Sequence, residues 1–225
     1  MSSGRVFRFA ASREHQCEHR TNHLFVFLHG CGATAQSMIP IAFRFQARFP
    51  SAALVVPSGF DPDARGEVAQ DWYPTRGLNV DNHGERVAAI LPDVDDLVRR
   101  EQTHFDVPWN RTVLIGFSQG GTVALEAVKA PELAGAVVAF SARYARLPAQ
   151  GTRIRSRIHL VHGEFDSVVS RVYAERAARV LTGLQVPCTL DIVEHDGHEL
   201  SHRAISLGSL RLLQGIYEGR RATLH

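Results

Sequence analysis

One stretch, RTVLIGFSQGG at residues 111–121, constrains the fold more than any other part of the chain. Residues 112–115 are apolar or β-branched, as in a fully buried strand, and the run ends at glycine rather than at a polar turn. The G-x-S-x-G pattern of residues 116–120 follows directly, and residues 122–130 then have the composition of a helix, with Pro131 just beyond its end. This succession is typical of a nucleophile elbow, the sharp turn that exposes a catalytic serine above a sheet.

Ser118, the serine of this pattern, has two interpretations. In an elbow, a side chain at position 116 or 120 would collide with neighbouring backbone, which explains Gly116 and Gly120. The alternative is that Ser118 is an ordinary helix N-cap beside a glycine-rich turn. The strand and helix on either side favour the elbow.

A second glycine-rich turn, HGCG at residues 29–32, follows the apolar residues 24–28. Glycines at the end of a strand leave backbone N–H groups pointing into open space, as an oxyanion hole requires. We therefore expect the backbone amides of Cys31 and Gln119 to form such a hole. The alternative is a tight turn without chemistry, because an amphipathic helix is expected at residues 33–49.

The rest of the chain alternates between expected strands and expected helices. The strands are residues 6–9, 24–28, 54–57, 112–115, 134–140, 158–161 and 188–194, and the helices are residues 33–49, 82–104, 122–130, 169–181 and 201–215. Pro92 should kink the second helix or break it in two. Such alternation implies a mainly parallel sheet with helices on both faces, whose sites lie at the carboxyl ends of the strands.

Composition limits the classes of partner. A chain of 225 residues with 44% hydrophobic content is long enough for one well-buried domain, and we expect a single one. The 25 basic and 23 acidic residues are spread along the chain, which argues against nucleic acid or an anionic membrane as a partner. No apolar run approaches the length of a membrane span and no signal-peptide pattern opens the chain, so we expect a cytoplasmic protein.

The three cysteines could indicate a disulfide framework, and one histidine-rich segment could indicate a metal site. Cys17, Cys31 and Cys188 have no framework spacing, so free thiols are expected. The segment from His15 to His23 holds several ligand types, but its H-x-C-x-H spacing matches no tetrahedral pattern. We therefore favour surface histidines over a metal site.

Every candidate chemical group falls at the end of an expected strand. Ser118, Asp166 and His198 occur in the chain order Ser, Asp, His, which is the order of an α/β-hydrolase. Asp191 lies inside an expected strand, and Asp196 shares a loop with the histidine that it would have to orient. The sequence therefore favours Asp166 as the acid.

The choice of base has three candidates. His195 directly follows a strand, where we expect sheet packing to hold it, and His202 should lie in the first turn of the final helix. His198 follows Gly197, whose permissive backbone allows the loop to turn toward the elbow. His198 is therefore the predicted general base.

Several motifs together resemble the phospholipase/carboxylesterase family of small serine hydrolases, which includes the acyl-protein thioesterases. These motifs are LHGxG at 28–32, DWY at 71–73, GFSQGG at 116–121, HGxxDxVV at 162–169 and GH at 197–198. Within the family, the chain looks closest to the bacterial YpfH-type esterases. It departs from the family pattern at Ala33, often Asp in the family, and at Ser167, often Pro.

The long loop of residues 58–80 lies beside this expected site, and a loop of that length is usually functional. It carries Trp72 and Tyr73, which we expect to wall the acyl pocket. The competing interpretation is that Trp72 anchors the loop to the body of the protein.

The resemblance implies an α/β-hydrolase fold without a sizeable lid, since residues 141–157 are too few for one. It implies a serine carboxylesterase that hydrolyses short- to medium-chain acyl esters through an acyl-serine, with Ser118, His198 and Asp166 as the triad and no metal ion or organic cofactor. An acyl-protein thioesterase or lysophospholipase is the alternative, because the chemistry passes through the same intermediate. A third hypothesis is an inactive hydrolase fold that only binds a ligand.

Overall fold

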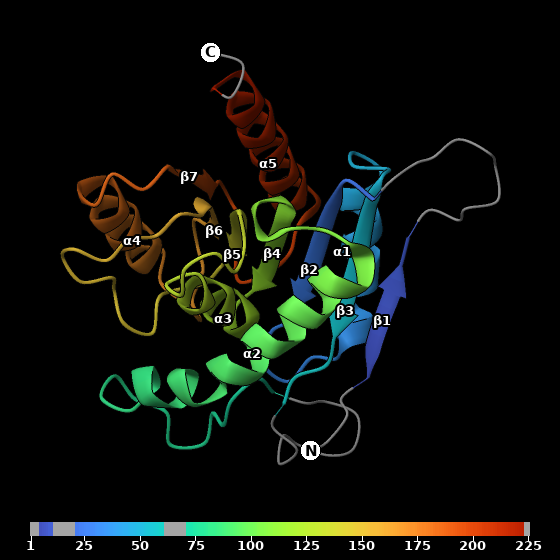
Figure 1. The fold of residues 1–225 in the computed structure, drawn as a ribbon. Coiled ribbons are helices and arrows are strands. Elements are labelled where there is room, and N and C mark those ends of the chain that lie inside the picture. The colour runs from blue at the N-terminus through green and yellow to red at the C-terminus, as the bar shows by residue number, and fades with distance from the viewer. Residues whose placement is uncertain (1–4, 11–20, 61–70, 223–225) are drawn as a thin grey trace, which may run out of the picture.

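The computed structural model describes residues 5–10, 21–60 and 71–222. Within them the strands form a seven-stranded sheet in the order β1-β3-β2-β4-β5-β6-β7 (Figure 1). The strands are β1 (Val6–Phe9), β2 (His23–Leu28), β3 (Ala52–Pro57), β4 (Thr112–Phe117), β5 (Ala136–Phe140), β6 (Arg157–Gly163) and β7 (Cys188–Val193). All neighbours pair in parallel except β1, which pairs antiparallel with β3 at one edge.

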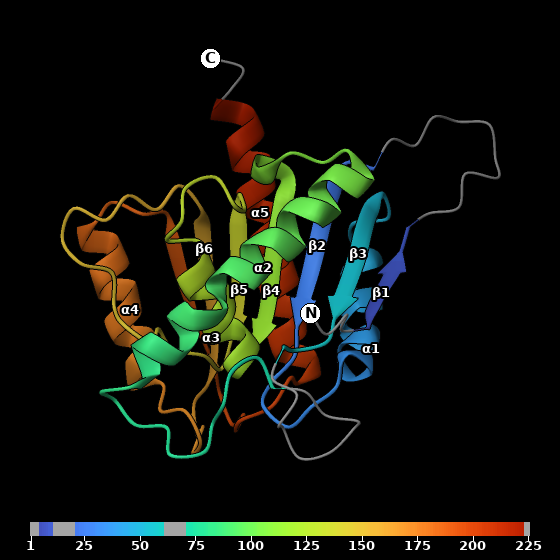
Figure 2. The ribbon, with the colours of Figure 1, turned by 60° about the horizontal axis from the view of Figure 1, so that its bottom comes forward.

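Helices cover both faces of the sheet (Figure 2). They are α1 (Ala35–Gln46), α2 (His83–Phe105), α3 (Gln119–Ala127), α4 (Val172–Gly183) and α5 (His202–Ala222), with a short 3-10 turn, η1 (Trp109–Arg111), before β4. α1 and α5 pack on one face, and α2, α3 and α4 pack on the other. The expected mainly parallel sheet between two helical layers is confirmed.

Two apolar cores follow from this sandwich, one on each face of the sheet. In β2, Leu24 and Val26 belong to the core under α2, α3 and α4, whereas Phe25 and Phe27 belong to the core under α1 and α5. Because both faces are buried, a parallel strand in this position needs an uninterrupted apolar sequence rather than an alternating one. No residue of β1 is fully buried, as expected of an edge strand.

Two helix expectations concern a proline and a glycine. Pro92 was expected to kink the second helix or break it in two, and the break is wrong, because Pro92 lies inside the single helix α2. Its exposed position leaves the carbonyl that loses a helical partner within reach of water. α5 continues past Gly215 to Ala222. Gly215 does not end the helix; it packs closely against the side chain of Arg157.

The region between β5 and β6 forms no helix or strand among the described residues, so the carboxyl edge of the sheet carries no sizeable lid there. The candidate catalytic groups Ser118, Asp166 and His198 lie at this open edge, in the segments that follow β4, β6 and β7. None of the described helices is both long enough and apolar enough to span a membrane.

Candidate active site

Ser118 stands at the turn between β4 and α3, with φ 52° and ψ −114°. A residue with a side chain rarely adopts this backbone conformation, and it persists where the surrounding structure enforces it. The Ser118 hydroxyl makes no capping hydrogen bond to α3. The ordinary N-cap interpretation is therefore wrong, and the turn has the geometry of a nucleophile elbow.

The glycines beside Ser118 allow backbone to approach backbone. A Cβ atom on Gly120 would meet the carbonyl groups of Leu28 and His29 at the end of β2. A Cβ atom on Gly116 would meet the backbone of Gly120. The start of α3 can therefore sit directly against the sheet only because both positions lack a side chain.

His198 connects the elbow with the end of β6. Its Nε2 lies 3.0 Å from Ser118 Oγ, and its Nδ1 lies 2.8 Å from Asp166 Oδ2. An Nδ1–H donated to ionised Asp166 leaves the Nε2 lone pair to accept the serine proton. The ring also lies against Phe117, with 5.0 Å between the centroids, which limits its rotation. Three groups from distant parts of the chain thus form a continuous hydrogen-bonded relay.

The Asp166 carboxylate is held in its ionised form. Burial by itself would raise its pKa, but hydrogen bonds from His198 and from the backbone N–H groups of Val169 and Val168 outweigh burial and lower the pKa below its ordinary value. The two backbone bonds reach Oδ1 at 2.8 and 2.9 Å. This leaves Oδ2 for the histidine, so the carboxylate and the imidazole keep a fixed mutual orientation.

His162 is a further residue of this site, to which the sequence assigned no role. Its Nε2 lies 2.7 Å from the carbonyl oxygen of Val169 and 3.2 Å from Asp166 Oδ2. Burial lowers its pKa and so favours the neutral ring, whose single N–H can donate to both oxygens. His162 therefore braces the Asp166 loop. The HG pair that begins the HGxxD motif is the signal that marks it.

The competing acids are engaged elsewhere. Both oxygens of Asp191 accept hydrogen bonds from Arg211, at 2.7 and 2.8 Å. Asp196 accepts a hydrogen bond from the Ser201 hydroxyl at the start of α5. The histidine pairs instead with Asp166, so the geometry agrees with the choice of Asp166.

The competing histidines also lie outside the relay. His202 is the first residue of α5, as expected, and it is exposed. His195 was expected to pack into the sheet, and this was wrong: it is exposed in a turn with φ 66°. The strand ends at Val193, before this turn begins.

The loop after β2 approaches the elbow closely. A Cβ atom on Gly30 would lie 3.5 Å from the Cβ of Ser118. Asp71 holds the next residues, since its Oδ1 accepts from the Gly32 N–H at 2.6 Å and its Oδ2 accepts from Cys31 Sγ at 3.2 Å. This role of Asp71 was not predicted from the sequence, although the DWY motif marks the residue. A buried carboxylate thus fixes the loop in which Cys31 was expected to supply an oxyanion-hole amide.

Gln119 is the first residue of α3, so its backbone N–H has no partner within the helix. Its buried side chain ties the elbow to the DWY segment: Oε1 accepts from the Trp72 N–H at 3.0 Å, and Nε2 donates to the Tyr73 carbonyl at 2.9 Å. The elbow, the DWY segment and the loop after β2 therefore form one connected unit.

Trp72 and Tyr73 are buried. The Trp72 indole N–H donates to the His29 carbonyl at 2.8 Å, and the Tyr73 hydroxyl lies 2.9 Å from His83 Nε2. These contacts favour the anchoring interpretation of Trp72 over a wall of an acyl pocket. Residues 61–70 of the same loop lie outside the described residues.

His15, Cys17 and His19 of the histidine-rich segment lie outside the described residues. In the part of the chain that is described, no three His, Cys, Asp or Glu side chains are grouped so that they could hold a metal ion. Cys31 and Cys188 form no disulfide bond among the described residues.

Comparison with known proteins agrees with this geometry. The family described as Phospholipase/Carboxylesterase matches residues 14–207. Esterase YpfH of Escherichia coli (strain K12) is 38% identical over 183 residues, which cover 81% of this chain and 78% of that protein. Acyl-protein thioesterase 1 of Cryptococcus neoformans var. neoformans serotype D is 31% identical over 108 residues, which cover 44% of this chain and 45% of that protein.

A solved structure, that of esterase PE8, superposes with a TM-score of 0.82 at 22% sequence identity. The match covers 94% of this chain and 98% of that one. At this identity the likeness concerns the fold, which is the same along nearly the whole of both chains.

Proposed function

The chain belongs to the phospholipase/carboxylesterase family of α/β-hydrolases, and from this premise we propose that it is a serine carboxylesterase for short- to medium-chain acyl esters. The observation that carries the proposal is the unbroken relay from Ser118 through His198 to Asp166. In this proposal Ser118 is the nucleophile, His198 the general acid and base, and Asp166 the group that fixes the imidazole.

In the acylation step, Ser118 Oγ attacks the ester carbonyl carbon while His198 Nε2 takes the hydroxyl proton. Asp166 stabilises the imidazolium that forms. When the tetrahedral intermediate collapses, His198 returns the proton to the departing alcohol, and the acyl group remains on the serine. Water, deprotonated by the same histidine, then attacks the acyl-serine and releases the carboxylic acid.

The developing oxyanion is stabilised by the backbone amides of Cys31 and Gln119 in this proposal. Support comes from the approach of the Gly30 region to Ser118 and from the position of Gln119 at the N-terminus of α3. The partial positive charge of a helix N-terminus adds to the stabilisation of negative charge. Asp71 and the Gln119 side chain hold the two halves of the hole in place.

The open carboxyl edge of the sheet supports a broad choice of ester. Phe165 and Val168 flank Asp166 with exposed apolar side chains and offer surface to an acyl or alcohol group. A thioesterase is the second candidate, favoured by the similarity to acyl-protein thioesterase 1, because thioesters react through the same acyl-serine. A lysophospholipase reaction would also use this intermediate.

A substrate panel separates these activities. We would measure kcat/KM for p-nitrophenyl esters from acetyl to dodecanoyl and for thioesters with the same acyl groups. The carboxylesterase proposal expects an optimum among the short to medium esters, whereas an optimum among long-chain thioesters would favour the second candidate. Absence of hydrolysis together with failure of Ser118 to react with a fluorophosphonate would leave only a binding function.

A further inference from the structure

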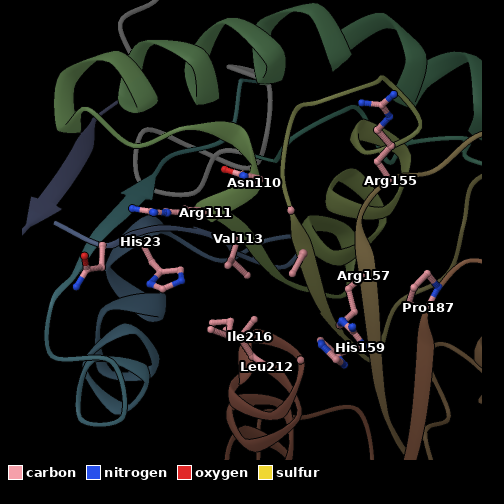
Figure 3. A pocket seen from close by; sticks show the side chains of 14 residues that line it. His23, Asn110, Arg111, Val113, Arg155, Arg157, His159, Pro187, Leu212 and Ile216 are labelled. Carbon is pink, nitrogen blue, oxygen red and sulfur yellow. The ribbon is translucent and has the colours of Figure 1, made fainter. Parts of the chain in front are cut away.

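A cavity lies at the amino ends of the strands, opposite the carboxyl ends where Ser118 lies. Figure 3 shows the side chains that line it. It has a volume of about 530 Å³ and lies between the amino ends of β2, β4, β5 and β6 and the C-terminal half of α5. We call it the basal cavity; the residues that matter for its chemistry are Arg111, Val113, Arg157, His159, Gly215 and Ile216.

The basal cavity has a basic lining. Arg111, Arg155 and Arg157 line it, and no Asp or Glu is among its described lining residues. Arg155 and Arg157 form ion pairs with Glu132 and Glu218, which are exposed and reach the arginines from outside the lining. Exposed pairs of this kind contribute little stability, so an entering anion can compete with them. Arg111 forms no ion pair with any described residue.

His159 adds a buried polar atom without a partner. The residue is 1% exposed, and its Nδ1 lies 2.9 Å from the Thr189 hydroxyl. Its Nε2 is buried and has no hydrogen-bond partner. In native proteins nearly all buried polar atoms form hydrogen bonds. An unpartnered Nε2 beside a basic cavity therefore indicates that a bound group completes its hydrogen bonding.

Gly215 leaves room for the Arg157 side chain to lie between α5 and His159. A Cβ atom at this position would lie 2.6 Å from Arg157 Cδ and 3.2 Å from His159 Nε2. Glycine in the interior of a helix lowers helix stability relative to alanine. A side chain here would displace Arg157, so this glycine allows Arg157 and His159 to lie next to each other at the cavity.

Apolar side chains form one part of the cavity lining. In Figure 3, Arg111 lies on one side and Arg157 and His159 lie on the other, with Val113, Leu212 and Ile216 between them. Cationic groups beside an apolar floor match a ligand that combines an acidic head with a short apolar body.

From this arrangement we propose that the basal cavity binds a small organic anion, a carboxylate or phosphate monoester with a short apolar body, through Arg157, Arg111 and the unpartnered Nε2 of His159. The site is separate from the catalytic relay. Val113 lies near the amino end of β4 and Ser118 directly follows its carboxyl end, five residues further along the chain, which corresponds to about 17 Å at a rise of about 3.3 Å per residue. A ligand there does not occupy the acyl site, and it stabilises the folded protein by mass action.

Isothermal titration of the full-length protein with hexanoate, hexyl phosphate, inorganic phosphate and hexanol tests the proposal. Ser118 is first blocked with a fluorophosphonate, so that the catalytic site cannot take up a carboxylate. We expect saturable one-to-one binding of hexanoate, of hexyl phosphate or of both, and the comparison of these two decides between a carboxylate and a phosphate head. Equal affinity for inorganic phosphate and hexyl phosphate would contradict the organic anion, and equal affinity for hexanol would contradict the anionic head.

Three variants locate the binding. Arg157→Gln and Arg111→Gln should each weaken it at least about tenfold, as loss of a charge-assisted hydrogen bond does. Arg48→Gln removes the same charge from an exposed arginine outside the cavity and should leave binding unchanged. All three should retain wild-type esterase activity. Undiminished binding by both cavity variants would overturn the proposal.

A spectroscopic measurement distinguishes the anion from an ordered water at His159. The imidazole nitrogen signals of the blocked protein are followed by NMR during the titration. The proposal expects the Nε2 signal of His159 to shift with the same saturation curve as the calorimetric binding. A signal that stays constant while the anion saturates would show that the head lies elsewhere.

Discussion

In the proposed mechanism His198 has the most demanding role of any residue in the site, because it takes a proton from Ser118 and later returns it to the leaving group. It can do so because its two ring nitrogens face different partners, Asp166 at 2.8 Å and Ser118 at 3.0 Å. The same loop region holds His195 and His202, which are exposed and outside this relay. The three histidines therefore provide a direct test of the assignment.

Replacing each histidine with alanine should give unequal losses. His198→Ala should abolish measurable ester hydrolysis, because it removes the general base. His195→Ala and His202→Ala should change kcat/KM by less than about tenfold, which is below the usual contribution of general base catalysis. Hydrolysis of p-nitrophenyl butyrate by purified variants measures this, and a near-normal His198→Ala enzyme would contradict the triad.

Two carboxylates can be compared in the same way. Asp166→Asn should remain folded and lose about 10⁴-fold in kcat, because the amide no longer imposes the required imidazole tautomer. Asp196→Asn is the matched control, since its contact is with Ser201 at the start of α5 rather than with the relay. If Asp196→Asn lost more activity than Asp166→Asn, the assignment of the acid would be wrong.

At the scale of elements, the elbow depends on direct backbone contact between α3 and the end of β2. Local sequence was sufficient to predict it, because an apolar strand, the glycines and the following helix are adjacent in the chain. Local sequence did not decide whether Pro92 breaks its helix, and it wrongly placed the end of the last helix at Gly215, because both outcomes depend on the neighbouring elements. Pro92 is exposed, and Gly215 is a packing contact.

Gly120→Ala should damage the elbow. The added Cβ would meet the carbonyls of Leu28 and His29, which are backbone atoms and cannot rotate away. We expect the free energy of unfolding to fall by about 1–3 kcal/mol, as for other overpacked sites, and kcat to fall because Ser118 is displaced. Urea denaturation and kcat measure the two effects.

Gly183→Ala is the control for this variant. A Cβ on Gly183, the last residue of α4, would meet nothing within 4 Å. It should leave both stability and kcat close to those of the wild type. Equal behaviour of the two variants would show that close backbone packing at Gly120 does not shape the elbow.

At the scale of the whole molecule, alternation of apolar strands with amphipathic helices was enough to predict the parallel sheet and the edge at which the catalytic groups meet. The supporting contacts could not be predicted in this way. Asp71 binds the Gly32 amide across 39 residues, and Gln119 binds Trp72 across 47. No local sequence pattern encodes such pairs. The motifs therefore indicated which residues belong to the site, but not which atoms of these residues form hydrogen bonds with each other. The same reason explains why Trp72 was assigned to a pocket wall.

Several buried histidines should make the fold sensitive to acid. Burial lowers the pKa of His83 and of His159 from 6.5 to about 4. Above pH 6.5 these rings are neutral in both the folded and unfolded states, whereas between about pH 6.5 and 4 only the unfolded chain takes up the proton. The free energy of unfolding should therefore fall as the pH is lowered through this range, by up to about 1.4 kcal/mol per pH unit for each histidine.

Urea denaturation at several pH values checks this effect. His159→Gln should make the pH dependence shallower by the contribution of one histidine. His202→Gln, which changes an exposed histidine, should leave it as in the wild type. Identical slopes for the two variants would contradict the role assigned to the buried ring.

The central claim is that Ser118 is a nucleophile activated by His198, and covalent labelling tests it most directly. Wild-type protein, His198→Ala and His195→Ala would be treated with a fluorophosphonate, and the modified residue and the rate of its modification would be determined by peptide mass spectrometry. We predict an adduct on Ser118 in the wild type, formed at a similar rate in His195→Ala and at least about 100-fold more slowly in His198→Ala, consistent with the loss of a general base. An adduct on another residue, or a wild-type rate of labelling in His198→Ala, would contradict the account.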